Sequence, residues 1–348
     1  MSDRYEIFIF TSDRDLGDSQ PYTNTPLKIW VKKSGIFVYY APPEALKWKI
    51  ILKEIKAVHP NFIYLNGMYA RYYAIYPLLM KRIGKTDAKV ILAPRGMLQY
   101  GALRFKTQKK KFFLRVLNFL EIPKCITAHA TDEQEKRDIK RYLHEINEIV
   151  VLPNFSATHQ NDPVYISKLP NTLRCIFISR ISPKKNLLFF IGLLTKLPSF
   201  INLTFVIRGN IESNEYWRKC EDVIKTLPKN ISVKYEGAVN NDEVVSLIQQ
   251  YHTFVLPTLG ENFGHAIFEA FSAGRPVLIS DQTPWRNLRK QQAGWDLPLN
   301  ETAFIEAIQE AASMNDETFQ QWCKGAWQFA NDYIAKSDIK NQYLKLFS

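Results

Sequence analysis

The sequence predicts an α/β protein with two doubly wound domains, each built on a parallel sheet. Strand-like apolar runs alternate with helical segments along nearly the whole chain. Runs such as 253–256 and 277–280 are apolar without alternation, as in strands that are covered on both faces. A length of 348 residues is enough for two domains of ordinary size.

The first half of the chain alternates strands and helices. We expect strands at 7–11, 35–39, 62–65, 89–93, 125–128 and 148–152, and helices at 43–58, 72–83, 107–120 and 131–143. Thr131 with Gln134 three residues later, and acidic residues between and after them, predicts a helix start. The loops after the strands carry TSDRDLGD at 11–18, Asn66–Gly67 and Pro94–Arg95–Gly96–Met97.

The second half repeats this organisation after a polar, proline-bearing stretch at 153–170, which predicts a linker between the domains. We expect strands at 174–179, 202–207, 231–235, 253–256 and 277–280. The helices are expected at 187–196, 215–226, 242–250, 265–273, 301–314, 317–333 and 337–347.

Composition narrows the classes of protein. The chain has no run of eighteen apolar residues and a charged start, so we expect a cytoplasmic protein without a membrane span or signal peptide. Its four cysteines are scattered without a C-x-x-C pattern, and its six histidines lack ligand spacing. We therefore expect reduced thiols, no structural metal and no cofactor.

Positive charge is concentrated in the first half. Residues 1–160 contain 26 Lys and Arg against 15 Asp and Glu, whereas residues 161–348 contain 20 against 19. Within the first half, the segment 104–115 (RFKTQKKKFFLR) is basic and interleaved with aromatic residues. It is compatible with a solvated helix face, with an anionic membrane surface or with an anionic lipid-linked acceptor. We expect no nucleic-acid partner, because no nucleic-acid module is recognisable.

Two carboxylates stand out in the apolar stretch 251–281. Glu261 follows a predicted strand, where open α/β sheets bind ligands, and Glu269 lies eight residues later in an apolar helix. The helix start after Phe263–Gly264 favours an anion such as phosphate, so the two acids could hold sugar rings on either side of a pyrophosphate. Alternatively, Glu261 is an ordinary loop residue and Glu269 a core carboxylate with a local partner.

Cations follow the first strand of the second half. Arg180 and Lys185 precede the helix predicted at 187–196, and two cations beside a helix N-terminus make an anion site. A basic loop at a helix start is the alternative. Gly209 and Gly237 follow the next two strands, where glycine permits close backbone approach or simply makes an ordinary turn.

The segment ENFGHAIFEA at 261–270, followed by FSAGRPV, resembles the E-x7-E motif of family 4 retaining glycosyltransferases. These enzymes have the GT-B fold, in which two Rossmann-like domains face each other. The resemblance implies that Glu261 contacts hydroxyls of the donor sugar and that Glu269 holds the ribose. It also implies that Asn262, Phe263 and Gly264 lie close to the donor.

The resemblance extends to other loops. R-x4-K, here Arg180 and Lys185, is similar to the family's pyrophosphate-binding pair, with Lys184 as a neighbouring candidate and Asn186 where glycine is usual. Gly209 and Gly237 resemble the walls of the nucleotide-base pocket. FTSDRDLGD, YLNG and APRGML resemble segments of enzymes that build bacterial surface polysaccharides, and Arg95 stands about where many members have a histidine at the reaction centre.

The beginning of the chain departs from the family pattern. Members normally start with an additional strand and a glycine-rich loop, whereas here Gly17 is the first glycine. We expect an acceptor-binding domain at 1–165 that lacks its first strand and a nucleotide-sugar-binding domain at 166–325. The resemblance also implies that helices at 326–348 cross back to the first domain.

The resemblance implies a metal-independent transferase that moves a sugar from a nucleotide-diphosphate sugar to a glycan or lipid-linked acceptor with retention of configuration. Bacterial O-antigen, capsule or exopolysaccharide synthesis is the expected setting, at the inner face of the plasma membrane. The alternative is a shortened, non-catalytic relative that binds nucleotide-sugar or serves as a partner subunit.

Overall fold

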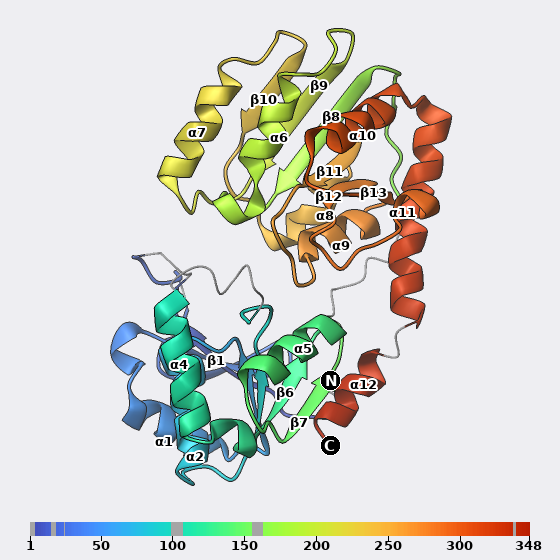
Figure 1. The fold of residues 1–348 in the computed structure, drawn as a ribbon. Helices are drawn as coiled ribbons and strands as arrows, with labels where there is room; N and C mark the ends of the chain where they lie inside the picture. The colour runs from blue at the N-terminus through green and yellow to red at the C-terminus, as the bar shows by residue number, and fades with distance from the viewer. Residues whose placement is uncertain (1–3, 15–18, 24, 99–106, 155–162, 337–338) are drawn as a thin grey trace. The chain divides into compact units, whose positions relative to one another are not determined.

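The computed structural model describes residues 4–14, 19–23, 25–98, 107–154, 163–336 and 339–348 (Figure 1). The fold is α/β with mainly parallel sheets, as the sequence predicts. The chain divides into two compact units. Unit 1 comprises Met1–Pro153 and Ile339–Ser348, and unit 2 comprises Asn154–Asp338.

The strands of unit 1 form two sheets. The first has the order β1-β3-β2, with β1 and β3 parallel and β2 antiparallel, and the second has the order β4-β5-β6-β7, all parallel. The strands are β1 (Phe8–Ser12), β2 (Trp30–Lys33), β3 (Ile36–Ala41), β4 (Phe62–Asn66), β5 (Lys89–Ala93), β6 (Ile126–Ala130) and β7 (Glu148–Val151). No described strand pairs with both β1 and β4. The short, partly exposed β2 was not predicted.

Helices connect these strands close to the expected positions. They are α1 (Trp48–Val58), α2 (Tyr76–Arg82), α4 (Thr107–Phe119) and α5 (Glu133–Tyr142), with shorter helical turns at 43–45, 71–75 and 122–125. The cap of α5 differs from the prediction, because Asp132 and not Thr131 accepts the backbone N–H of Glu135. Thr131 instead donates its hydroxyl to the buried Glu135 carboxylate.

The C-terminal helix α12 (Ile339–Leu346) belongs to unit 1. Leu346 is buried with Ile91 and Leu152, and the Phe347 ring lies 5.6 Å from the ring of Phe62. The sequence placed the return at 326, but the preceding helix α11 (Asp316–Lys336) packs on unit 2. The physical reason is its aromatic face, which includes Tyr333 and packs against a cluster in that unit.

Unit 2 has one parallel six-stranded sheet with the order β10-β9-β8-β11-β12-β13. The strands are β8 (Thr172–Ile178), β9 (Asn202–Arg208), β10 (Ile231–Tyr235), β11 (Thr253–Leu256), β12 (Val277–Ser280) and β13 (Gly294–Leu297). The last of these, GWDL, was not predicted because its alternation is too short to read. The predicted linker lies partly in 155–162, outside the described residues, and unit 2 begins at 154 instead of 166.

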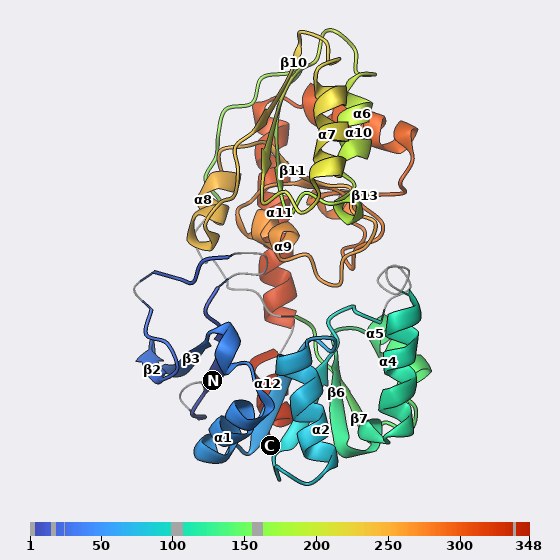
Figure 2. The ribbon, with the colours of Figure 1, turned by 90° about the vertical axis from the view of Figure 1, so that its left-hand side faces the viewer.

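Helices cover both faces of this sheet, as a doubly wound fold requires (Figure 2). One layer contains α6 (Leu187–Leu194), α7 (Asn214–Ile224) and α10 (Glu301–Ser313). The other contains α8 (Val244–Ile248), α9 (His265–Ser272) and α11, and single helical turns lie at 183–185, 241–243 and 289–291. Every residue of β11 and β12 is buried, which explains why their sequences are apolar without alternation.

Candidate functional site

The central feature of unit 2 lies where the loops after β8 and β11 meet. These strands are neighbours, and their connections run to opposite sides of the sheet, which makes this edge the topological switch point where open α/β sheets bind ligands. Lys185 follows β8 and Glu261 follows β11. The Lys185 Nζ lies 2.5 Å from the Glu261 Oε1, and each side chain is 12% exposed. Two charges predicted from separate motifs therefore form one half-buried ion pair.

Backbone hydrogen bonds tie the loop after β11 to the loop after β8 and to the loop after β12. The N–H of Leu259 donates to the carbonyl oxygen of Lys184 at 2.8 Å, and the N–H of Glu261 donates to the carbonyl of Gln282 at 2.9 Å. The backbone of Lys184 thus has a structural role in positioning the neighbouring Lys185. Backbone hydrogen bonds therefore fix the loops that carry Lys185 and Glu261, as a precise binding site requires.

Thr258 is a site residue that the sequence analysis missed. It is fully buried, and its hydroxyl lies 3.0 Å from the Glu261 Oε1 and 3.2 Å from the Lys184 carbonyl oxygen. The available signal was a hydroxyl residue three positions before Glu261 in a loop that otherwise contains Pro, Leu and Gly. Thr258 orients the carboxylate and so leaves only part of its acceptor capacity for a ligand.

The helix α9 begins immediately after Glu261–Asn262–Phe263. Its N-cap residue, Gly264, has φ +77°, and a Cβ there would lie 2.7 Å from the Ile267 Cδ1, so a side chain is disfavoured by both backbone and space. No side-chain hydrogen bond caps this helix start. Phe263 is buried, and its carbonyl oxygen accepts from the Trp285 Nε1 at 2.6 Å. A fixed helix N-terminus therefore lies beside the Lys185–Glu261 pair and favours an anion.

Glu269 lies on α9, about one turn after its start. Burial raises the pKa of its carboxyl group above the ordinary value, and no opposing interaction lowers it. Among the described residues the carboxylate has no hydrogen-bond or ion-pair partner, so the alternative of a core acid with a local partner finds no support. A desolvated carboxylate with unused acceptor capacity suits a ligand that offers hydroxyl groups.

Arg180 takes a different position from Lys185. Its Nη1 lies 3.0 Å from the Glu212 Oε1, and the Arg180 side chain is 61% exposed. Glu212 comes from the loop after β9, so the structure brings Arg180 to the same sheet edge but pairs it with another acid. An exposed ion pair contributes little to stability, and its guanidinium remains accessible to an anion.

The predicted glycine loops adjoin this edge. Gly209 has φ +136°, and a Cβ there would lie 2.0 Å from the carbonyl oxygen of Ser179 at the end of β8. Its N–H donates to the carbonyl of Gly237 at 2.8 Å. The loops after β8, β9 and β10 are therefore in close backbone contact, which permits only glycine at position 209.

Arg95 lies in unit 1, in the loop after β5, with φ +54°. Its side chain donates to the Asn66 Oδ1 at 3.0 Å and to the Tyr64 hydroxyl oxygen at 2.7 Å. The same Tyr64 hydroxyl lies 2.6 Å from the His129 Nδ1. Burial lowers the pKa of His129 to about 4, so the ring is neutral and its Nε2 donates to the Leu152 carbonyl. Side chains of β4 therefore help to hold Arg95 in place.

Chemically, unit 2 offers a cation, a helix N-terminus and two differently solvated carboxylates at one sheet edge. The cation and the helix suit phosphate oxygens, and the carboxylates suit hydroxyl groups. In the part of the chain that the structure describes, no cluster of three or more His, Cys, Asp or Glu could hold a metal ion. No helix in that part is long and apolar enough to cross a membrane.

Part of the chain matches a family of known proteins. Residues 166–326 match the family model of group 1 glycosyl transferases. The match falls within unit 2 and includes every candidate residue of the switch-point site.

Two curated proteins are similar to this chain. An uncharacterized glycosyltransferase of Methanocaldococcus jannaschii is 25% identical over 173 residues, which are 48% of this chain and 40% of that protein. An uncharacterized 41.2 kDa protein in the cps region of Klebsiella pneumoniae is 22% identical over 309 residues, covering 86% of this chain and 81% of that protein. The archaeal match thus spans well under half of that relative's length.

Solved structures show the fold. Sucrose-phosphate synthase from Thermosynechococcus elongatus has a TM-score of 0.72 at 16% identity, covering 98% of this chain and 89% of that chain. Anabaena HepE, solved with UDP and glucose, has a TM-score of 0.65 at 14% identity, covering 90% and 85%. The chain therefore has the GT-B fold, and residues 166–326, in its second unit, are similar to the group 1 glycosyl transferase model.

Proposed function

We propose that this protein transfers a sugar from a nucleotide-diphosphate sugar to a hydroxyl of a glycan or lipid-linked acceptor, with retention of configuration and without a metal ion. The group 1 domain and the GT-B fold support transferase activity. The relative in a cps region supports a role in bacterial surface-polysaccharide synthesis. The expected location is the cytoplasmic face of the membrane, where such acceptors would be presented.

The observation that carries the proposal is the meeting of Lys185, Glu261 and the N-terminus of α9 at the switch point of unit 2. Lys185 and the helix N-terminus would hold the diphosphate, with Arg180 as a further cation. Glu261, oriented by Thr258, would accept hydrogen bonds from the donor sugar, and Glu269 from the ribose. Gly209 and Gly237 would line the nucleotide, with Asn262, Phe263 and Gly264 against the donor.

In the proposed reaction, the bond between the anomeric carbon and the phosphate oxygen breaks while the acceptor oxygen attacks from the same face. The leaving phosphate oxygen takes the acceptor's proton, so no separate protein base is required. Fixed cationic groups that stabilise developing charge on a leaving group are usually the largest catalytic term. The role of Arg95, in unit 1, would be contact with the acceptor.

The test begins with Lys185→Met, which removes the cation but keeps the length of the side chain. We expect binding of nucleoside diphosphates and of inorganic pyrophosphate to weaken at least tenfold, about 1.4 kcal/mol. Lys196→Met is the matched control, because Lys196 forms an exposed pair with Glu301 at the other end of α6. Calorimetry on a panel of UDP, GDP and ADP would measure both variants.

Equal pyrophosphate binding in Lys185→Met and the control would contradict the assignment of the anion site. A separate transfer assay with Glu261→Ala, which we expect to abolish turnover in a folded protein, tests the catalytic part. A chain that binds nucleoside diphosphate but turns over no nucleotide-sugar with any glycan or lipid-linked acceptor would instead be a non-catalytic relative.

A further inference from the structure

The outer face of α4 carries two phenylalanines that the fold leaves in solvent. Phe112 is 67% exposed and Phe119 is 85% exposed, whereas Leu114 and Leu117 on the opposite side are buried in the core of unit 1. Positions 112, 115 and 119 are spaced by three and four residues, so Phe112, Arg115 and Phe119 share one helix face. The sequence could not show which aromatic residues of the basic segment point outward.

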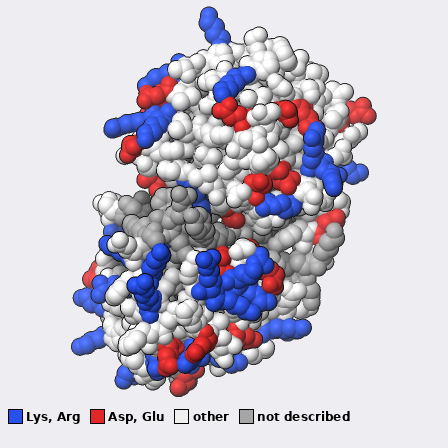
Figure 3. All heavy atoms as spheres, viewed as in Figure 1, with Lys and Arg blue, Asp and Glu red and all other residues white. Residues whose placement is uncertain are grey.

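This face has a net positive charge. The helix contains Lys109, Lys110, Lys111 and Arg115 and no acidic residue. Lys109, Lys111 and Arg115 are exposed, and Lys110 lies over the Tyr69 ring at 5.3 Å. Figure 3 shows Lys and Arg side chains over the part of unit 1 where Figure 1 draws α4 and α5.

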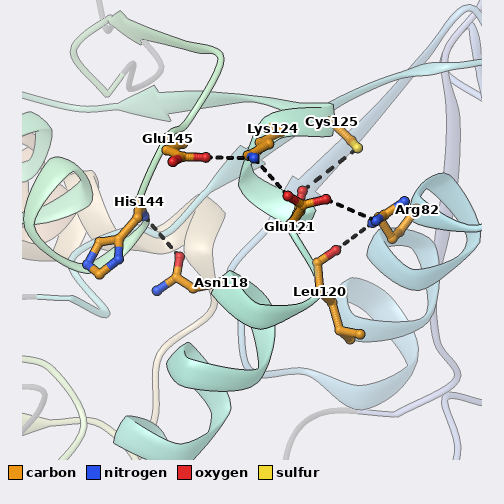
Figure 4. A network of polar contacts seen from close by, with 8 residues as sticks. All are labelled: Arg82, Asn118, Leu120, Glu121, Lys124, Cys125, His144 and Glu145. Atoms are coloured by element: carbon orange, nitrogen blue, oxygen red, sulfur yellow. Dashed lines mark hydrogen bonds and ion pairs between the residues drawn. The ribbon is translucent and has the colours of Figure 1, made fainter.

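Hydrogen bonds from two neighbouring segments hold the C-terminal end of α4 in place (Figure 4). Arg82 of α2 donates to the Leu120 carbonyl at 2.5 Å. On the other side, the Asn118 side chain donates to the Tyr142 carbonyl at 3.0 Å and accepts the N–H of His144 at 2.9 Å. Phe119 therefore lies between two anchored residues, so its exposure is a property of a fixed helix end.

The acids Glu121 and Glu145, near the C-terminal end of α4, form ion pairs with cations. Lys124 pairs with both Glu121 and Glu145 at 2.7 Å, and Arg82 pairs with Glu121 at 3.2 Å. The hydrogen bond and the charge of Lys124, with the charge of Arg82, lower the pKa of Glu121, so the acid stays charged and paired. The exposed cations Lys111 and Arg115 flank Phe112 along α4.

We propose that the outer face of α4 docks on an anionic lipid surface, with Phe112 and Phe119 entering the headgroup region and Lys111 and Arg115 contacting lipid phosphates. A fixed helix with aromatic residues and cations on one face has the composition of an interfacial helix. Ile83, 56% exposed beside Arg82 at the end of α2, adds apolar surface next to the pinned end of α4. This inference deepens the location part of the proposed function.

Co-sedimentation with lipid vesicles tests the proposal without any sugar donor, so it can fail while the proposed transfer stands. We expect the protein to bind vesicles of phosphatidylcholine mixed with phosphatidylglycerol, more weakly at high salt, and not vesicles of phosphatidylcholine alone. The double variant Phe112→Ser/Phe119→Ser should bind at least about tenfold more weakly. Lys111→Gln/Arg115→Gln should lose most of the preference for the anionic vesicles.

Phe200→Ser is the matched control, because Phe200 is 62% exposed but belongs to unit 2 and not to the basic segment 104–115. It should bind vesicles like the unchanged protein. Unchanged melting temperatures would show that the variants fold. Unaltered vesicle binding by the Phe112→Ser/Phe119→Ser protein would overturn the proposal, as would a change in oligomeric state alone, which would indicate contact with a second copy.

Discussion

At the scale of single residues, the environment of each acid decides its chemistry. Glu261 is satisfied by Lys185 and Thr258 and is available to a ligand only in part. Glu269 is half-buried without a partner among the described residues, and burial raises its pKa. A protein that keeps a desolvated, unpartnered carboxylate gives up stability at that position, which is typical of a binding site.

Glu269→Gln is therefore expected to separate stability from binding. The amide removes a desolvated charge, so the melting temperature at pH 7 should rise by about 2 °C. Binding of a nucleoside diphosphate should weaken, while binding of inorganic pyrophosphate, which lacks ribose, should not change. Thermal unfolding and calorimetry measure the two effects, with Glu306→Gln on the exposed side of α10 as the control.

The stability gained by Glu269→Gln over the unchanged protein should increase as pH rises. Because the folded-state pKa of Glu269 lies above the unfolded value, the folded state binds more protons in the window between them. The unchanged protein thus loses stability at this residue as pH rises through that window, and the advantage of Glu269→Gln should disappear below it. A variant less stable than the unchanged protein at pH 7 would show that Glu269 has a structural partner.

At the scale of elements, a buried arginine joins the ends of two helices. Arg275, fully buried after α9, donates to the carbonyls of Gln249 after α8 at 2.5 Å and Tyr251 at 2.7 Å, and to Val164 at 2.6 Å. It also reaches the carbonyl of Gly274 at 2.9 Å. The motif G-R-P-V near the predicted donor site thus has a structural role that brings α8, α9 and the entry segment of unit 2 together.

We expect Arg275→Met to destabilise unit 2, because the buried carbonyls would lose their donor. Each unsatisfied group costs about 1–3 kcal/mol, so a loss of about 3 kcal/mol is expected, a drop in melting temperature on the order of 10 °C. Differential scanning calorimetry measures this, with Arg289→Met as the control because Arg289 is 70% exposed. Equal melting of both variants would mean that water replaces the guanidinium without loss.

At the scale of the whole chain, unit 1 includes the C-terminal residues, which follow unit 2 in the sequence. The Phe347 ring lies 6.1 Å from the Tyr5 ring, 5.6 Å from that of Phe62 and 5.9 Å from that of Tyr64. The Tyr5 hydroxyl also donates to the Phe347 carbonyl at 3.0 Å. The first and last described residues therefore close the same side of unit 1.

Phe347→Ala is expected to loosen unit 1 and leave unit 2 unchanged, at a cost of about 2 kcal/mol for a partly buried aromatic ring. Hydrogen exchange measured by mass spectrometry should show faster exchange in β4 and β5 and the same protection in β8 and β11. Lys345→Ala, at an exposed position of α12, serves as the control. Loss of protection in unit 2 would show that the two units do not respond separately.

Local sequence patterns predict much of the secondary structure of this protein. Periodicity and turn residues predict most strands and helices, and the spacing of Glu261 and Glu269 predicts an acid on each side of a helix start. The short strands β2 and β13 were not predicted, because four residues carry too little pattern to distinguish a strand from a loop. The pairing of the strands of unit 1 into two sheets could not be predicted, since strand pairing is not local.

Tertiary structure alone decided which distant residues meet. Lys185 and not Arg180 pairs with Glu261, 76 residues away, because β8 and β11 are neighbours in the sheet. Packing likewise exposes Phe112 and Phe119 while burying Leu114 and Leu117. The physical reason is the same in each case: sequence periodicity reports the local conformation, whereas contacts depend on strand order and on which helix face the core covers.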